Sequence, residues 1–115
     1  MKKTKSTESL SGVELLLPLM NTLTDSVIAF DSMLKVCFSN QAAQTFFKIS
    51  EEQMLNKFMV ELLGTQNSVF NALEGVVRKN QSVTLPGAHI RGRPVHSAAI
   101  STVKEGSLYM LVLRQ

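Results

Sequence analysis

Apolar and polar positions divide the chain into a mostly helical first part and a strand-rich second part. Before residue 80, apolar side chains recur mostly every three or four positions, which predicts helices. After residue 80, short apolar runs are separated by glycine-containing turns, which predicts strands. A further pair of strands is predicted early in the chain. The predicted strands are residues 26–31, 35–39, 82–86, 94–103 and 107–113.

The two early strands form a predicted hairpin that leads directly into a helix. The first strand lies within the segment Asp25-Ser-Val-Ile-Ala-Phe-Asp31, and residues 32–35 form the turn. Asn40 follows the second strand and is a strong N-cap, because its side-chain oxygen accepts from free backbone N–H groups of a first helical turn. The helix after it places four apolar residues on one face: Ala42, Ala43, Phe46 and Phe47.

Three more helical segments are predicted before residue 80. Ser50-Glu-Glu-Gln53 has the capping-box pattern and begins a short helix. A further helical turn ends at Gly64, and residues 67–79 form the clearest helix, which Asn80 closes. The apolar stripe of that helix consists of Val69, Phe70, Leu73, Val76 and Val77.

The order of these elements predicts an α+β fold with the helices on one face of an antiparallel sheet. The last strand, residues 107–113, is apolar nearly throughout, as expected of a central strand covered on both faces. Pro86-Gly87-Ala88 is expected to interrupt the third strand.

The N-terminal region divides into a polar tail and an apolar segment. Residues 1–12 are expected to be a flexible tail, and residues 13–115 one domain. Residues 13–23 carry a helical stripe that either covers the sheet of its own domain or pairs with a second copy of the chain. This candidate dimer helix contains Val13, Leu16, Leu17 and Met20.

The same apolar segment is too short to be a membrane span. A transmembrane helix needs about 20 mostly apolar residues, and here Glu14 and Pro18 interrupt the run. We therefore expect a cytoplasmic domain without direct membrane insertion.

Charge and cysteine content narrow the function classes. The net charge is +3, of which residues 1–10 contribute 3 − 1 = +2, so the folded body carries little excess charge and nucleic-acid binding is not expected. The one cysteine, Cys37, rules out an intrachain disulfide framework and is expected to be a small core residue.

The early hairpin and helix start resemble the PAS domain family. Asn40, Ala42, Ala43 and Phe47 match the family's Asn-x-Ala-Ala-x-x-x-Phe/Leu pattern, and the resemblance covers roughly residues 13–114. It implies a five-stranded antiparallel sheet with short helices and one longer helix on one face, plus an N-terminal flanking helix. The chain departs from the family at Met33-Leu34, which replaces a common Asp-Gly turn. This apolar turn is either a partner surface or is tucked against the N-terminal helix.

The resemblance implies a sensory and dimerisation input domain of a signal-transduction protein, with a sensor histidine kinase as the expected parent. The alternatives are a diguanylate cyclase, a transcriptional regulator, or a ligand-free protein–protein interaction module. A homodimer is expected, together with a downstream output domain in a parent that continues beyond this chain, or from which the chain is excised.

No cofactor and no enzymatic activity are expected. Haem-binding members of the family are expected to use a histidine on the long helix, and residues 66–80 contain none. Flavin photosensors carry a reactive cysteine in a short helix, whereas Cys37 lies in a predicted strand. His89 and His96 lie in or near predicted strands and are expected to be ordinary surface or hydrogen-bonded residues. A small molecule between sheet and helices is still an option, with a candidate lining of Phe46, Phe47, Phe70 and Leu73.

Overall fold

The computed structural model describes residues 25–115, which form five strands and four helices. The strands are β1 (Ser26–Phe30), β2 (Val36–Ser39), β3 (Val83–Ile90), β4 (Arg93–Lys104) and β5 (Leu108–Arg114). The helices are α3 (Gln41–Phe47), α4 (Glu51–Met54), α5 (Met59–Leu63) and α6 (Ser68–Lys79). The predicted tail and the predicted N-terminal helix, residues 1–12 and 13–23, lie outside the described residues.

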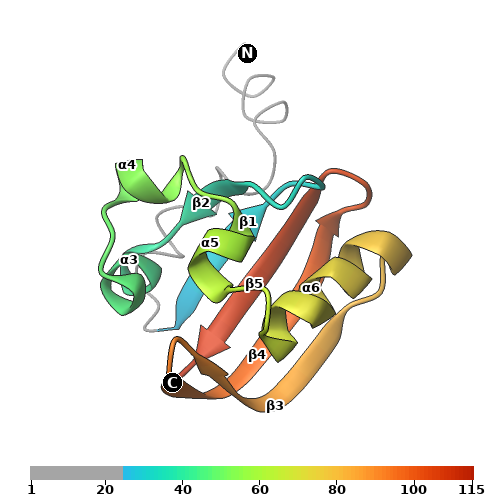
Figure 1. Ribbon diagram of the computed structural model, residues 1–115. Coiled ribbons are helices and arrows are strands. Elements are labelled where there is room, and N and C mark those ends of the chain that lie inside the picture. The colour runs from blue at the N-terminus through green and yellow to red at the C-terminus, as the bar shows by residue number, and fades with distance from the viewer. Residues whose placement is uncertain (1–24) are drawn as a thin grey trace, which may run out of the picture.

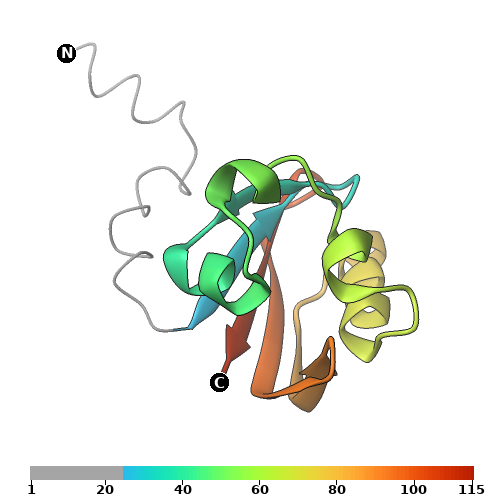
Figure 2. The ribbon, with the colours of Figure 1, turned by 60° about the vertical axis from the view of Figure 1, so that its left-hand side comes forward.

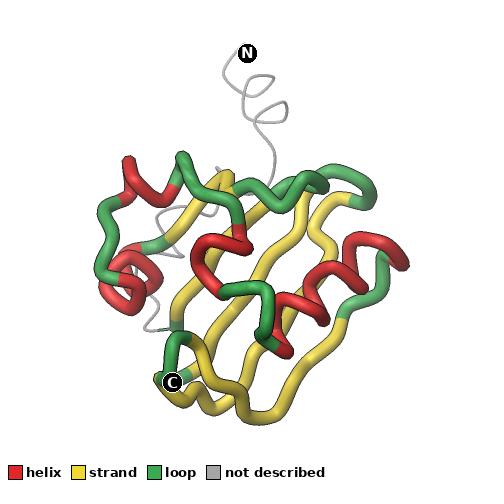
Figure 3. Tube along the Cα trace, viewed as in Figure 1, coloured by secondary structure: helices red, strands yellow, loops and turns green. Residues whose placement is uncertain are grey.

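The five strands form one antiparallel sheet in the order β2-β1-β5-β4-β3 (Figure 1). The helices all lie on one face of this sheet, as Figures 2 and 3 also show, so the predicted α+β class is confirmed. The last strand, β5, occupies the centre, and its side chains alternate between buried and half-buried along its length. Its apolar sequence follows from this position, because a central strand is covered on both faces.

Local capping signals place the helices where the sequence predicts them. The Asn40 side chain caps α3 by accepting from the Ala43 N–H at 3.0 Å. Ser50 and Gln53 form the predicted capping box of α4. Asn80 ends α6 in the left-handed conformation with φ 54°, so the predicted C-terminal stop of that helix is confirmed.

A bulge in the first hairpin explains why Cys37 is not a core residue. Ala29 pairs with Phe38, and the next pair is Phe30 with Val36, so Cys37 has no residue opposite it. An extra residue in one strand is left unpaired and redirects its side chain. The prediction of a buried Cys37 is therefore wrong, and the residue is exposed on the edge strand β2.

The third strand is longer than predicted, because it continues through the proline and glycine. Pro86 is tolerated because β3 lies at the edge of the sheet, where a missing N–H need not face a neighbouring strand. Gly87 has φ +82°. At this residue the alternation of core-facing and outward-facing side chains along β3 shifts by one position. Leu85 packs on the core before the glycine and Ala88 packs on it afterwards.

The core lies between the sheet and the helices, and a smaller apolar cluster occupies the opposite face of the sheet. The main cluster includes residues of all four described helices and all five strands. On the opposite face, Val27, Ala29 and Phe38 are buried and contact half-buried residues of β5. The alternation along β1 causes this division, because successive side chains point to opposite faces of a strand.

Candidate functional site

The Asn40 side chain connects three parts of the domain, close to the residue at which the described chain begins. Asn40 is fully buried, and its side chain makes more contacts than a helix cap requires. Its amide oxygen accepts from the Val27 N–H at 3.0 Å as well as from the first turn of α3. Its amide nitrogen donates to the Asp25 carbonyl at 2.9 Å. One side chain thus joins the entry of the chain, strand β1 and helix α3.

The end of the central strand lies beside this entry. The Arg114 Nε atom lies 3.5 Å from the Asp25 carboxylate, and both side chains are largely or partly exposed. The Gln115 side-chain nitrogen lies 3.4 Å from the Ser26 hydroxyl. The two ends of the described chain are therefore neighbours at one edge of the molecule. We call these four residues, Asp25, Ser26, Arg114 and Gln115, the entry–exit junction.

The four candidate pocket residues are part of the main core. Phe46 and Phe47 lie on α3, with ring centres 5.0 Å apart in an edge-to-face contact. Phe70 and Leu73 lie on α6. All four are buried, with exposures between 0% and 8%. The structure thus places them between sheet and helices as expected, and their role in holding a ligand stays a prediction.

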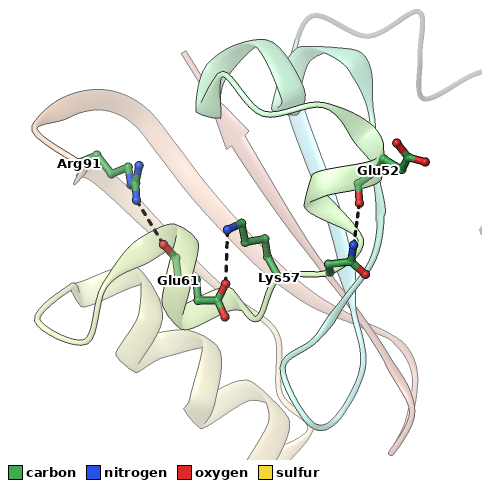
Figure 4. Close-up of polar contacts among 5 residues, drawn as sticks. Glu52, Lys57, Glu61 and Arg91 are labelled. Atoms are coloured by element: carbon green, nitrogen blue, oxygen red, sulfur yellow. Dashed lines mark hydrogen bonds and ion pairs between the residues drawn. The ribbon is translucent and has the colours of Figure 1, made fainter.

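Two arginines of the β3–β4 turn reach across to the helices. The Arg93 guanidinium lies 4.1 Å from the centre of the Phe46 ring and donates to the Phe46 carbonyl. Arg91 donates to the Glu61 carbonyl in α5 at 3.3 Å (Figure 4). The Glu61 carboxylate is 3.7 Å from the Lys57 ammonium group in the same view. The turn therefore holds the ends of two strands against two helices.

A hydroxyl group links the central strand to the C-terminal end of the long helix. The Tyr109 hydroxyl donates to the Asn80 side chain at 3.2 Å and accepts from the Gly106 N–H at 3.1 Å. Its ring stacks on Phe30, with ring centres 5.7 Å apart. Tyr109 is 1% exposed, so both polar partners are needed to satisfy a buried hydroxyl. Sequence reasoning did not identify this residue or Arg93, because neither stands in a local motif.

One surface hollow has a volume of about 610 Å³. It lies between the first turn of α6 and the ends of β3 and β4. The Asn67 side chain spans its wall, capping α6 and donating to the His89 carbonyl at 2.8 Å. The sequence analysis missed this double contact, because it placed Asn67 inside the helix predicted over residues 67–79, whereas Asn67 is the N-cap of α6.

His89, His96 and Cys37, the titratable residues discussed in the sequence analysis, do not form a reactive group. His89 and His96 are both exposed on strands. Partial desolvation raises the pKa of the Cys37 thiol, the Asp31 carboxylate raises it further, and Lys35 lowers it. A raised pKa reduces the thiolate fraction and so the nucleophilicity of this exposed thiol. Among residues 25–115, no group of three or more His, Cys, Asp or Glu could hold a metal ion.

The four residues of the candidate dimer helix, Val13, Leu16, Leu17 and Met20, lie outside the described residues. None of the helices in the described part of the chain is long and apolar enough to cross a membrane.

Solved structures with the same arrangement of elements come from diverse proteins. One is the PAS domain of nitrogen regulation protein NR(II) from Vibrio parahaemolyticus, with 20% identity and a TM-score of 0.65. That match covers 91% of this chain and 98% of the other. A PAS domain from a two-component sensor histidine kinase matches with 14% identity and a TM-score of 0.64, covering 88% of this chain and 93% of that one. The PAS domain of the fruit-fly ELK potassium channel gives 10% identity and a TM-score of 0.69, covering 91% and 97%.

The structural matches share the fold at low sequence identity. A search of curated proteins finds no match to the chain. The model of the PAS fold family matches residues 15–115, which is nearly the whole sequence. The chain therefore belongs to the PAS fold family.

Proposed function

We propose that this PAS domain is the sensory and dimerisation input domain of a sensor histidine kinase. One of the similar structures supports this parent, since it is described as a PAS domain from a two-component sensor histidine kinase. The alternative is the input domain of a diguanylate cyclase or a transcriptional regulator. The choice between these outputs depends on the parent and not on residues of the domain itself.

The observation that carries the proposal is the entry–exit junction. β5 lies at the centre of the sheet, and its last residues contact the residues at which the described chain begins. A shift of the helices would reach β5 through the core and through the Tyr109 hydroxyl, which contacts the end of α6. Such a shift would then change the geometry of the entry–exit junction. That is the arrangement a relay between an input and an output needs.

The apolar surface on the outer face of the sheet, opposite the helices, supports dimerisation through the N-terminal segment. This face carries Val27, Ala29 and Phe38 together with three half-buried residues of β5: Leu108, Met110 and Val112. We propose that the stripe of residues 13–23 packs on this face and pairs with the same stripe of a second copy. Removal of apolar area from water is the main favourable contribution to such association.

A relay that works without a ligand is the alternative to small-molecule sensing. Phe46, Phe47 and Phe70, the candidate lining, are buried in the main core between helices and sheet. The small-molecule alternative predicts that some compound raises the melting temperature in a thermal-shift screen. Native mass spectrometry of the same samples would detect a molecule retained during purification.

The dimer is tested by light scattering on chain 1–115. Leu16→Glu or Met20→Glu should give monomers, because each places a charge in the apolar stripe. Thr22→Glu is the matched control, since residue 22 is not one of the stripe residues, and it should leave the mass unchanged. An unaltered mass in both stripe variants would reject this interface.

The parent is tested separately, by reading the gene beyond the codon for Gln115. A phospho-acceptor histidine region followed by an ATP-binding domain is expected. The purified full-length protein should then label itself from γ-³²P-ATP, and Asp25→Ala should change the labelling rate by altering the junction. A cyclase or DNA-binding domain in that place would overturn the kinase assignment and leave the input role standing.

A further inference from the structure

The turn between β3 and β4 carries two arginines, Arg91 and Arg93, that cap two different helices. Arg91 donates to the Glu61 carbonyl of α5 (Figure 4), and Arg93 donates to the Phe46 carbonyl of α3. Both acceptors belong to the last turn of their helix, where backbone carbonyls have no partner within the helix. The helix dipole also favours a cation at this end. We call Arg91 and Arg93 the arginine clasp.

The two capped helices belong to different groups within the helical layer. Helix α3 contacts α4, and these two helices lie over β1 and β2 (Figure 2). Helix α5 contacts α6, which packs on β3 and β4. The arginine clasp therefore fastens one helix of each group to the same short turn.

Arg91 occupies a backbone conformation that does not favour arginine. Arg91 has φ 54° and Gly92 has φ 80°, and Ile90 pairs with Arg93 across this short loop. Hairpin loops with positive φ at both positions strongly favour Asn-Gly. The turn thus accepts some strain by carrying arginine at its first position, and the contact with α5 gives a physical reason for that choice.

Arg93 covers an aromatic side chain of the main core. Its guanidinium lies 4.1 Å from the centre of the Phe46 ring, which packs edge-to-face on Phe47. Phe46 is only 4% exposed, whereas Arg93 itself is exposed. The guanidinium is therefore an outer cover of this part of the core, and its removal exposes the ring to water.

Neither clasp arginine is held by an ion pair within residues 25–115. The ion pairs there are Lys57–Glu61 and Arg114–Asp25. A bidentate pair with a carboxylate would hold a guanidinium more firmly than a single carbonyl does. The clasp can therefore release its two helix ends while the strands of the sheet stay paired.

We propose that the arginine clasp is a conformational device that sets how readily α3 and α5 open away from the sheet. When closed, it holds both helix ends on the β3–β4 turn and covers Phe46. When open, it frees both helix ends together and admits water to the core beside Phe46. This opening requires neither a second copy of the chain nor a particular output domain, so it is independent of the proposed function.

The test is amide hydrogen–deuterium exchange of chain 1–115 under native conditions, which measures local opening element by element. Arg93→Ala should speed exchange at least about threefold in α3, through loss of the cation–π contact and the cap. It should also speed exchange in α5, because both caps come from one turn. Exchange in β5 reports global stability and should change less. The matched control is Arg78→Ala, which removes another exposed arginine, from the last turn of α6, and should leave α3 and α5 unchanged.

Arg91→Asn separates the clasp from an ordinary turn. Asparagine suits the positive φ, so this variant should slow exchange in the β3–β4 hairpin. Loss of the contact with the Glu61 carbonyl should at the same time speed exchange in α5 and, through the shared turn, in α3. A turn with only a structural role would instead gain protection in all of these elements. The proposal is overturned if α5 is unchanged or slowed in Arg91→Asn, or if Arg93→Ala affects α3 alone, neither helix, or β5 equally.

Discussion

At the scale of single residues, Asn40 shows how one buried amide serves both local and long-range structure. As a helix cap it follows from the residues next to it in the sequence, since an N-cap bonds within its own first turn. The same oxygen also accepts from Val27, thirteen residues earlier, and the amide nitrogen donates to Asp25. The cap could be predicted from sequence, whereas the links to β1 could not, because they depend on where the strand folds back.

We predict that Asn40→Ala lowers the free energy of unfolding by about 2–4 kcal/mol. Loss of a cap costs roughly 1 kcal/mol, and each buried group left without a partner adds about 1–3 kcal/mol. Urea denaturation followed by circular dichroism would measure the change. The control is Asn56→Ala, which removes one exposed hydrogen bond of 3.4 Å to the Glu52 carbonyl and should cost less than about 0.5 kcal/mol (Figure 4). Equal losses in the two variants would contradict the role given to Asn40.

At the scale of elements, backbone conformation distinguishes two glycines that look alike in the sequence. Gly75 lies within α6, and Gly87 lies within β3 at φ +82°. A methyl group added to either would meet no atom within 4 Å. Any difference between alanine variants at the two positions must therefore come from the backbone and not from crowding.

Gly75→Ala should stabilise the domain by roughly 0.5–1 kcal/mol, because alanine loses less backbone entropy in a helix. Gly87→Ala should destabilise it by about 1–2 kcal/mol, because an L side chain is disfavoured at positive φ. Thermal unfolding of both variants beside the wild type would measure the two shifts in opposite directions. A stabilised Gly87→Ala variant would show that β3 does not require the left-handed residue.

The extension of β3 and the exposure of Cys37 belong to this same scale. Proline and glycine predict a break in a strand, yet β3 continues because it lies at the sheet edge. Cys37 reads as a core residue between apolar neighbours, yet a bulge turns it outward. Both errors arise because strand position and register are set by pairing with distant segments.

At the scale of the whole molecule, one core connects every described element. The main apolar cluster joins all four described helices to the sheet. Tyr109 lies within it on the central strand, stacked on Phe30 and hydrogen-bonded to Asn80. The described part of the chain should therefore unfold as a single cooperative unit.

The chain has one tyrosine and no tryptophan, so its intrinsic fluorescence comes from Tyr109 alone. We predict that the urea transition followed by this fluorescence coincides with the transition followed by far-ultraviolet circular dichroism. For comparison, an extrinsic fluorescent probe attached to Cys37 in the Tyr109→Phe variant would report unfolding at the edge strand β2. Separate midpoints would mean that the central strand and the helices unfold independently.

The sequence by itself determined the class of fold, the order of its elements, the starts of α3 and α4, the C-terminal ends of α5 and α6, and the likeness to the PAS family. These features depend on hydrophobic periodicity and on capping residues, which act over a few neighbouring positions. Only the tertiary structure decided that Arg93 lies on the Phe46 ring, that Tyr109 bonds the end of α6, and that Arg114 lies beside Asp25. Those contacts join residues 29 to 89 positions apart, and which distant segments become neighbours depends on how the sheet is ordered and how its faces pack.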